Sequence, residues 1–166
     1  MRALFGCAFL SLLVVPAVAS AAESDFLKPL AGQWKGSGTV LTRIGSNPIN
    51  VNCGFDIGAG SSDLSMNGTC RGLLVVRRSV AAKLKANGQS YSGTYTGPSG
   101  MPSSLSGSRK GNAINLAVRW ARVVNGDRTA TMVLEKVADN RLRLQTIDKD
   151  PSTGKSVVTS QISLSR

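Results

Sequence analysis

Short segments in which apolar residues alternate with other residues run through most of this chain, and turn residues separate them. Two clear examples are the alternate residues Val51, Cys53, Phe55 and Ile57, and the alternate residues Leu64, Met66, Gly68 and Cys70. Alternate residues of a β-strand point to the same face, so the pattern predicts strands with one buried face. Turn pairs such as Asn87-Gly88 join successive segments. The chain is therefore predicted to be all-β, with about ten antiparallel strands in a meander.

The predicted meander favours closure into a barrel. No segment has the pattern of a long helix that could cover an open sheet, and closing a sheet on itself removes its unpaired edges. Residues 72–80 are ambiguous, because a short apolar run fits either a buried strand or a helical turn. We expect one domain, an up-and-down antiparallel β-barrel spanning residues 22–166.

The first residues of the chain predict an export signal. Arg2 is followed by an apolar run at residues 4–15, then by Pro16 and a series of small residues. This order is typical of a cleavable secretory signal peptide. A membrane anchor is the alternative, but about 12 apolar residues fall short of the ~20 that span a bilayer. We expect a signal peptide at residues 1–21, no transmembrane segment in the mature chain, and a periplasmic or secreted protein.

Cys53 and Cys70 are the two cysteines that follow the predicted signal peptide. An even number of cysteines in an exported chain predicts a disulfide, with two free buried thiols as the alternative. If the two residues pair in one hairpin, Phe55 faces Gly68 and the flanking apolar residues also face one another. One register therefore satisfies both the apolar alternation and the bridge.

The charge of the chain is strongly positive, with a formal net charge of +11. Residues 64–126 hold nine Lys and Arg and no acid. This imbalance indicates an anionic partner, and for an exported chain an anionic envelope surface fits better than nucleic acid. The candidate contacts are Arg77, Arg78, Arg109 and Lys110. The alternative is a solvated basic surface that only keeps the protein soluble.

Histidine is absent from the chain, which constrains its chemistry. The absence removes the Ser–His and Cys–His nucleophile systems and imidazole ligands for metals and haem. The Asp residues lie mostly near turns, where Asp is expected anyway. No nucleophile elbow, Cys-x-x-Cys motif, phosphate loop or carboxylate cluster with metal spacing occurs. We expect no catalytic residues, no metal site, no cofactor and no enzymatic activity.

The motif Gly32-Gln33-Trp34 opens the first predicted strand and resembles the start of calycin-type barrels, the lipocalins, fatty-acid-binding proteins and nitrobindin-like proteins. This resemblance implies a barrel whose tryptophan closes one end. An indole suits such a role because it has a large apolar area and one N–H donor. Nitrobindin-like proteins hold haem through a histidine, and fatty-acid-binding proteins use a late Arg-x-Tyr pair. Neither feature occurs here, so neither is implied.

A weaker resemblance points to periplasmic inhibitors of secreted metalloproteases. Leu30 to Trp34 and the early pair Cys53 and Cys70 are similar to the layout of these short barrels. Such inhibitors insert a free N-terminal segment into the protease, and residues 22–29 are the matching segment. The mature chain predicted here is longer than theirs.

Four aromatic residues are candidates to line a ligand site. Tyr91 and Tyr95 share one strand face with Gly93 between them, where a glycine would leave space. Trp34 and Trp120 complete the set, and ordinary core packing is the alternative for each.

We expect a non-enzymatic exported binding protein for a small apolar or anionic amphipathic ligand. An inhibitor or an envelope-interaction protein that acts through its surface is the alternative. A binding barrel should hold a cavity of ~300–1,000 Å³, whereas an inhibitor can have a filled barrel.

Overall fold

The computed structural model describes residues 18–73 and 75–166 of the chain. Most of the predicted signal peptide, residues 1–17, lies outside the described residues. The described part begins with α1, a short helix that runs across the predicted start of the mature chain. This helix was not predicted from the sequence.

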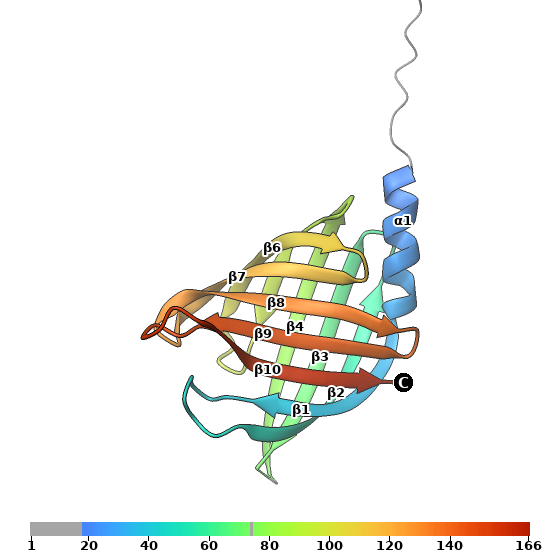
Figure 1. Cartoon of the computed structure of the whole chain (residues 1–166). Helices are drawn as coiled ribbons and strands as arrows, with labels where there is room; N and C mark the ends of the chain where they lie inside the picture. Colours follow the sequence, from blue (N-terminus) through green and yellow to red (C-terminus); the bar gives the residue numbers. More distant parts are fainter. Residues whose placement is uncertain (1–17, 74) are drawn as a thin grey trace, which may run out of the picture.

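The described chain forms a closed barrel of ten strands (Figure 1). Every strand pairs antiparallel with the next, and β1 closes the barrel by pairing with β10. The predicted all-β antiparallel barrel is therefore confirmed. The elements are α1 (Val18–Leu27), η1 (Lys28–Leu30), β1 (Gly32–Val40), β2 (Ile49–Ala59), β3 (Asp63–Gly72), β4 (Val76–Asn87), β5 (Ser90–Thr96), β6 (Pro102–Lys110), β7 (Ala113–Val124), β8 (Asp127–Ala138), β9 (Arg141–Lys149) and β10 (Ser156–Ser165).

The hairpin of β2 and β3 has the predicted register. Cys53 pairs with Cys70 and Phe55 with Gly68, and a disulfide joins the two cysteines. The ambiguous residues 72–80 divide between the end of β3, a turn and the first part of β4. Leu73 has a positive φ of 47°, which reverses the chain there, so this apolar run ends in a turn rather than in a helix.

The two ends of the barrel differ. Because neighbouring strands run in opposite directions, the turns of the meander alternate between the ends. The turns β1–β2, β3–β4, β5–β6, β7–β8 and β9–β10 lie at one end, which we call the mouth. The other turns lie with α1 and η1 at what we call the closed end (Figure 1).

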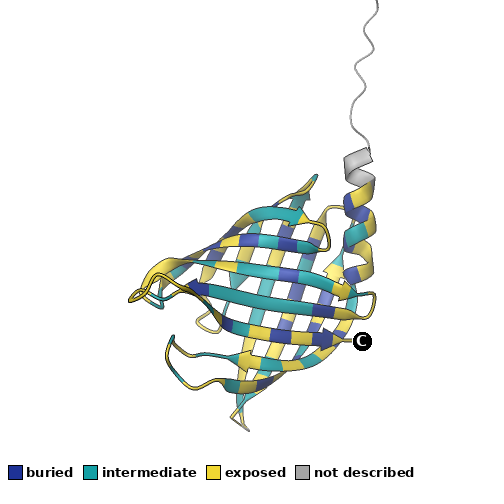
Figure 2. Cartoon of the chain, viewed as in Figure 1, coloured by how far each residue is buried: buried dark blue, intermediate teal, exposed yellow. Residues whose placement is uncertain are grey.

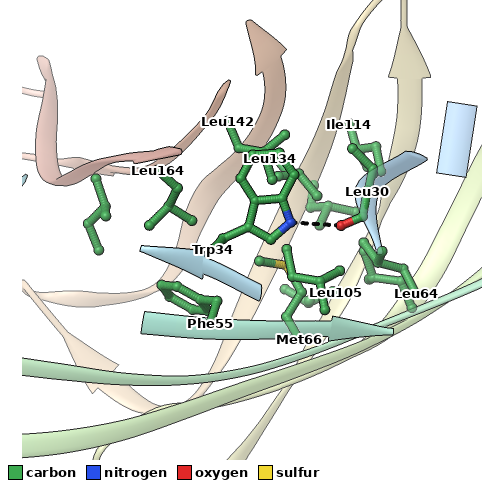
Figure 3. Close-up of a cluster of buried hydrophobic side chains, with 14 of the residues drawn as sticks. Leu30, Trp34, Phe55, Leu64, Met66, Leu105, Ile114, Leu134, Leu142 and Leu164 are labelled. Carbon is green, nitrogen blue, oxygen red and sulfur yellow. Dashed lines mark hydrogen bonds between the residues drawn. The ribbon is translucent and has the colours of Figure 1, made fainter. Parts of the chain in front are cut away.

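Trp34 anchors a dense apolar core in the closed half of the barrel. The residue is 1% exposed and its indole lies among leucines from several strands (Figure 3). Its Nε1–H donates to the carbonyl of Leu30 at 2.9 Å, and the Arg166 guanidinium lies 4.6 Å from the ring centroid. The indole therefore closes this end, as the resemblance to calycin-type barrels implied.

Burial alternates along the strands, as Figure 2 shows in the banding of buried and exposed residues. In β7, Ile114, Leu116 and Val118 are buried. Asn115 and Arg119, at the alternate positions, take the other face. The period-two pattern therefore set which residues face the barrel interior.

Candidate functional site

A cavity of about 550 Å³ occupies the interior of the barrel toward the mouth. Its walls are mainly apolar. Phe55, Met66 and Leu134 belong both to this lining and to the core around Trp34, so the core forms its base. The volume falls within the ~300–1,000 Å³ range of small-molecule sites. The barrel is thus hollow in its mouth half, as expected for a binding barrel rather than a filled one.

Arg78 is the one Arg or Lys among the described residues that line this cavity. In β4 it shares a face with the buried Leu84, whereas Arg77 takes the outer face. Arg78 belongs to none of the ion pairs formed by the described residues. The strand alternation therefore splits the dipeptide: Arg78 lines the interior cavity and Arg77 does not, although both side chains are exposed to solvent.

Tyr95 and Trp120 lie together on the cavity wall. Their rings meet edge to face, with centroids 6.0 Å apart and planes at 67°. Burial raises the pKa of Tyr95 to about 12, so its hydroxyl stays neutral at physiological pH. The Trp120 Nε1–H is buried and has no acceptor among the described residues. A buried donor without an acceptor is unfavourable, so this N–H is available to a ligand atom.

The other two aromatic candidates lie in the closed half. Neither Trp34 nor Tyr91 is among the described residues that line the interior cavity. The Tyr91 hydroxyl donates to a carboxylate oxygen of Glu23 in α1. Burial, with help from Glu23, raises the pKa of Tyr91. Gly93 leaves no ligand space, because a Cβ there would lie 1.9 Å from the carbonyl oxygen of Lys83.

Glu23 holds α1 against the closed end and was not identified from the sequence. The residue is 2% exposed, and Arg109 Nη2 lies 2.9 Å from its Oε2. This hydrogen-bonded pair raises the pKa of the Arg109 guanidinium. Arg109 also lies 4.8 Å from the ring centroid of Phe26. The sequence carried no signal for the pair, because its members are 86 residues apart.

The four predicted anion-binding residues do not form one surface. Arg77 and Arg78 are the second and third residues of β4, which begins at the mouth. Arg109 and Lys110 are the last two residues of β6, which ends at the closed end. Arg109 is also occupied by Glu23. The two pairs of candidate contacts therefore lie at opposite ends of the strands and cannot contact one flat anionic surface together.

Residues 22–29, the segment matched to the inhibitor arm, lie within α1 and η1. Leu27 and Glu23 of this segment are buried. The segment packs on the barrel here, whereas an inhibitor arm must be free to enter a protease.

Asp148, near the mouth end of β9, is a buried acid that the sequence analysis did not single out. It accepts a hydrogen bond from the Thr159 hydroxyl, and its Oδ1 has no partner among the described residues. It is not one of the described residues that line the cavity. Its alternation with Leu142 and Leu144 was a signal that it faces inward.

Neither a metal-binding cluster nor a membrane-spanning helix occurs among the described residues. They contain no group of three or more Cys, Asp or Glu side chains placed to hold a metal ion. No helix among them is long and apolar enough to cross a membrane. A second depression, of about 770 Å³, lies over β1 to β5 and is lined by polar and apolar residues, with Lys35, Asp56, Arg77 and Arg78 as its charged members.

Comparison with known proteins shows similarity in fold alone. No family profile matches the sequence, and no curated protein matches it. Among solved structures, the chain is similar to Rv2717c from M. tuberculosis, with a TM-score of 0.66 and 16% identity over 90% of this chain and 98% of that one. It is also similar to the S-type phycobiliprotein lyase CPES from Guillardia theta, with a TM-score of 0.54 and 14% identity over 89% of this chain and 93% of that one.

The second comparison corrects one expectation. CPES is described as a lyase, which is an enzyme, so a barrel of similar fold belongs to an enzyme. The expectation that this chain has no enzymatic activity, which rested on missing histidine-based motifs, is overturned by that finding. Both comparisons are consistent with the calycin-like barrel that Gly32-Gln33-Trp34 implied.

Proposed function

We propose that the barrel binds an anionic amphiphile, with the apolar part in the cavity and the charged group beside Arg78. The observation that carries the proposal is Arg78 itself, the one cation among the described residues that line a mainly apolar cavity. An arginine there has no carboxylate partner among the described residues. A ligand anion would supply that partner.

The energetics favour a ligand with both an apolar and an anionic part. Burial of each CH₂ group contributes about 0.8 kcal/mol, so a chain of several carbons supplies most of the affinity. A guanidinium offers paired N–H donors that match a carboxylate, phosphate or sulfate. Specificity for an anion over a neutral analogue would then come from Arg78.

Trp120 adds a second recognition element to the proposal. Its buried Nε1–H lies on the cavity wall without an acceptor among the described residues. A ligand oxygen within the apolar part, such as a hydroxyl or carbonyl, would accept this hydrogen bond. Ligands with such an oxygen are proposed to bind more tightly than plain hydrocarbon chains.

Export to the periplasm or the cell exterior is part of the proposal. Two features support it, the signal-like residues 1–21 and the disulfide between Cys53 and Cys70. Disulfides form and persist in oxidising compartments. In such a compartment, amphiphiles are available from the lipids of the envelope.

The proposal is tested by titrating the purified protein with a fluorophore-labelled fatty acid and with the matching labelled alcohol. Arg78→Gln is expected to weaken binding of the acid by about 10- to 100-fold, because a hydrogen bond to a charged group contributes about 1.5–3 kcal/mol. The neutral alcohol should bind both proteins alike. Arg77→Gln is the matched control and should leave both affinities unchanged. Equal binding of the acid to the wild type and to Arg78→Gln would overturn the proposal.

A further inference from the structure

Most of the exposed large apolar side chains belong to the turns at the mouth of the barrel. Of the six large apolar residues that are exposed in the described part of the chain, five lie in or beside the mouth turns. These are Leu73, Val75, Met101, Val123 and Val158. The sixth, Val137, lies near the closed end. Leu73 and Val75 lie two residues apart in one turn, and adjacent exposed apolar side chains of this kind mark an interaction site more readily than isolated ones.

The turn between β3 and β4 is the most exposed of these places. Val75 is 83% exposed and Leu73 is 64% exposed. Figure 1 shows this hairpin projecting beyond the neighbouring turns. We call Arg71, Leu73, Val75 and Arg77 the β3–β4 finger.

Two arginines stand directly opposite each other at the base of this finger. Arg71 pairs with Arg77 across β3 and β4, and both are exposed. Like charges at facing positions of an antiparallel pair destabilise the sheet. Neither arginine belongs to an ion pair within the described residues, because the three ion pairs there all involve residues of the closed half. An external anion would relieve the repulsion.

The arrangement of the finger matches the depth profile of a lipid bilayer. Arg71 and Arg77 are each two residues from Leu73 or Val75, which corresponds to about 7 Å along an extended strand. An interfacial segment buries its apolar side chains about 5–10 Å into the boundary between headgroups and acyl chains. Apolar tips at that depth leave both guanidiniums at the level of the phosphates.

The other exposed charges at the mouth are mostly positive, like the two finger arginines. Exposed basic residues at this end include Arg43, Arg122, Lys149 and Lys155, besides the finger arginines and Arg78. The acids of the described mouth turns and strand ends are Asp127, which is exposed, Asp150, which is partly exposed, and the buried Asp148. Each Lys or Arg near an anionic membrane surface adds to its attraction for the protein.

We propose that the barrel docks mouth-down on an anionic lipid bilayer, with the β3–β4 finger entering the interface. Docked in this way, the cavity opens onto the lipid surface, with Arg78 at the entrance. An amphiphile would then pass between bilayer and cavity without crossing water. This purpose rests on the proposed function, whereas the docking itself rests only on the finger and the charge of the mouth.

The test is sedimentation with phosphatidylcholine vesicles and with vesicles that also contain phosphatidylglycerol, at about 0.1 M salt, where the screening length is ~10 Å. The wild type should pellet with the anionic vesicles only. Val75→Asp should weaken this binding at least tenfold, whereas Val137→Asp, an exposed valine at the closed end, should change it less than twofold. Arg71→Glu/Arg77→Glu should abolish binding, and Lys83→Glu/Lys110→Glu, with the same net charge, should retain most of it.

Three results would overturn the docking. The first is that the wild type does not pellet with the anionic vesicles. The second is that each variant and its matched control lose vesicle binding equally, which would indicate general charge attraction. The third is a concentration-dependent dimer, seen by sedimentation velocity without vesicles and lost in Val75→Asp, which would make the finger a contact between copies.

Binding of the labelled fatty acid in solution without vesicles distinguishes docking on the bilayer from binding in the cavity. Val75→Asp and Arg71→Glu/Arg77→Glu alter residues that do not line the cavity, so both should bind the acid like the wild type. Vesicle binding without acid binding would leave the docking standing and remove the proposed function. Binding of the acid without binding to vesicles would leave the proposed function standing and remove the docking.

Discussion

Arg78 stands opposite Cys70 in the antiparallel pair of β3 and β4, and this register turns the arginine toward the barrel interior. A disulfide joins Cys70 to the buried Cys53 of β2. The bridge therefore fixes which residues of β2, β3 and β4 face the barrel interior. A slip of one residue would exchange the faces of Arg77 and Arg78. The same dipeptide therefore places Arg78 on the cavity lining and Arg77 in the β3–β4 finger.

The disulfide should contribute substantially to stability. Replacing both Cys53 and Cys70 with Ala is expected to lower the free energy of unfolding by about 3 kcal/mol, since the bridge restricts the unfolded chain. Urea titration of the oxidised wild type and the double variant measures the difference. Reduced wild type is the control and should resemble the variant. Identical midpoints for all three proteins would show that the bridge has no stabilising role.

Trp34 should be the most sensitive position of the closed end. Trp34→Ala empties a site that is 1% exposed and should destabilise the protein by ~3–5 kcal/mol. Trp34→Phe keeps much of the apolar area but loses the donor to Leu30, so a smaller loss is expected. Urea unfolding measures both. A loss below about 1 kcal/mol for the alanine variant would contradict the closing role of the indole.

Glu23 and Arg109 should depend on each other. Breaking a buried ion pair leaves one charge without a partner, so Glu23→Gln is expected to destabilise the folded protein by about 3 kcal/mol. Lys110→Gln, at the exposed neighbour of Arg109, should be neutral. Circular dichroism during urea unfolding gives the free energies. If Glu23→Gln and Lys110→Gln unfold alike, the pair does not hold α1 to the barrel.

The two tyrosines of the chain should resist ionisation in the folded state. Burial raises the pKa of Tyr95 to about 12 and also raises that of Tyr91. Absorbance at the tyrosinate band should therefore be small at about pH 10.5 in native protein. In denaturant both tyrosines should titrate near their ordinary pKa of about 10. Half-ionised tyrosine at that pH in folded protein would contradict the burial of both rings.

The same shifts predict how stability depends on pH. The folded state favours neutral tyrosine, so this contribution is fully present below the unfolded pKa of about 10. It is lost as the pH rises from there through the folded pKa of Tyr95, about 12. Tyr95→Phe should flatten the decline seen in urea titrations across that window. An unchanged slope in this variant would show that Tyr95 does not contribute.

Trp120 should report on the cavity by fluorescence. The chain has two tryptophans, and Trp34→Phe leaves Trp120 as the remaining one. Because Trp120 lines the cavity, the labelled fatty acid should quench its emission in that variant. The matched variant Trp120→Phe retains only Trp34, which lies in the core of the closed end, and should show much weaker quenching. Equal quenching in both would place the ligand elsewhere.

Most of the fold was predictable because it depends on local patterns. The alternation in segments such as residues 51–57 set the strands and their inner faces, and turn pairs such as Asn87-Gly88 set where strands end. Helix α1 was not predicted, since its packing depends on Glu23 meeting Arg109 and Tyr91 from distant strands. No local pattern encodes such a meeting.

By itself, the sequence determined an all-β meander and the register of the Cys53–Cys70 hairpin, whereas the place of Trp34 at the barrel end came from the resemblance to calycin-type barrels. Only the tertiary structure decided that Arg78 but not Arg77 lines the interior cavity, that Arg109 is paired with Glu23, and that the mouth half is hollow. The reason is physical. Alternation along a strand is read from neighbouring residues, whereas cavity volume and charge pairing depend on how closure of the barrel brings together residues that are far apart in the chain.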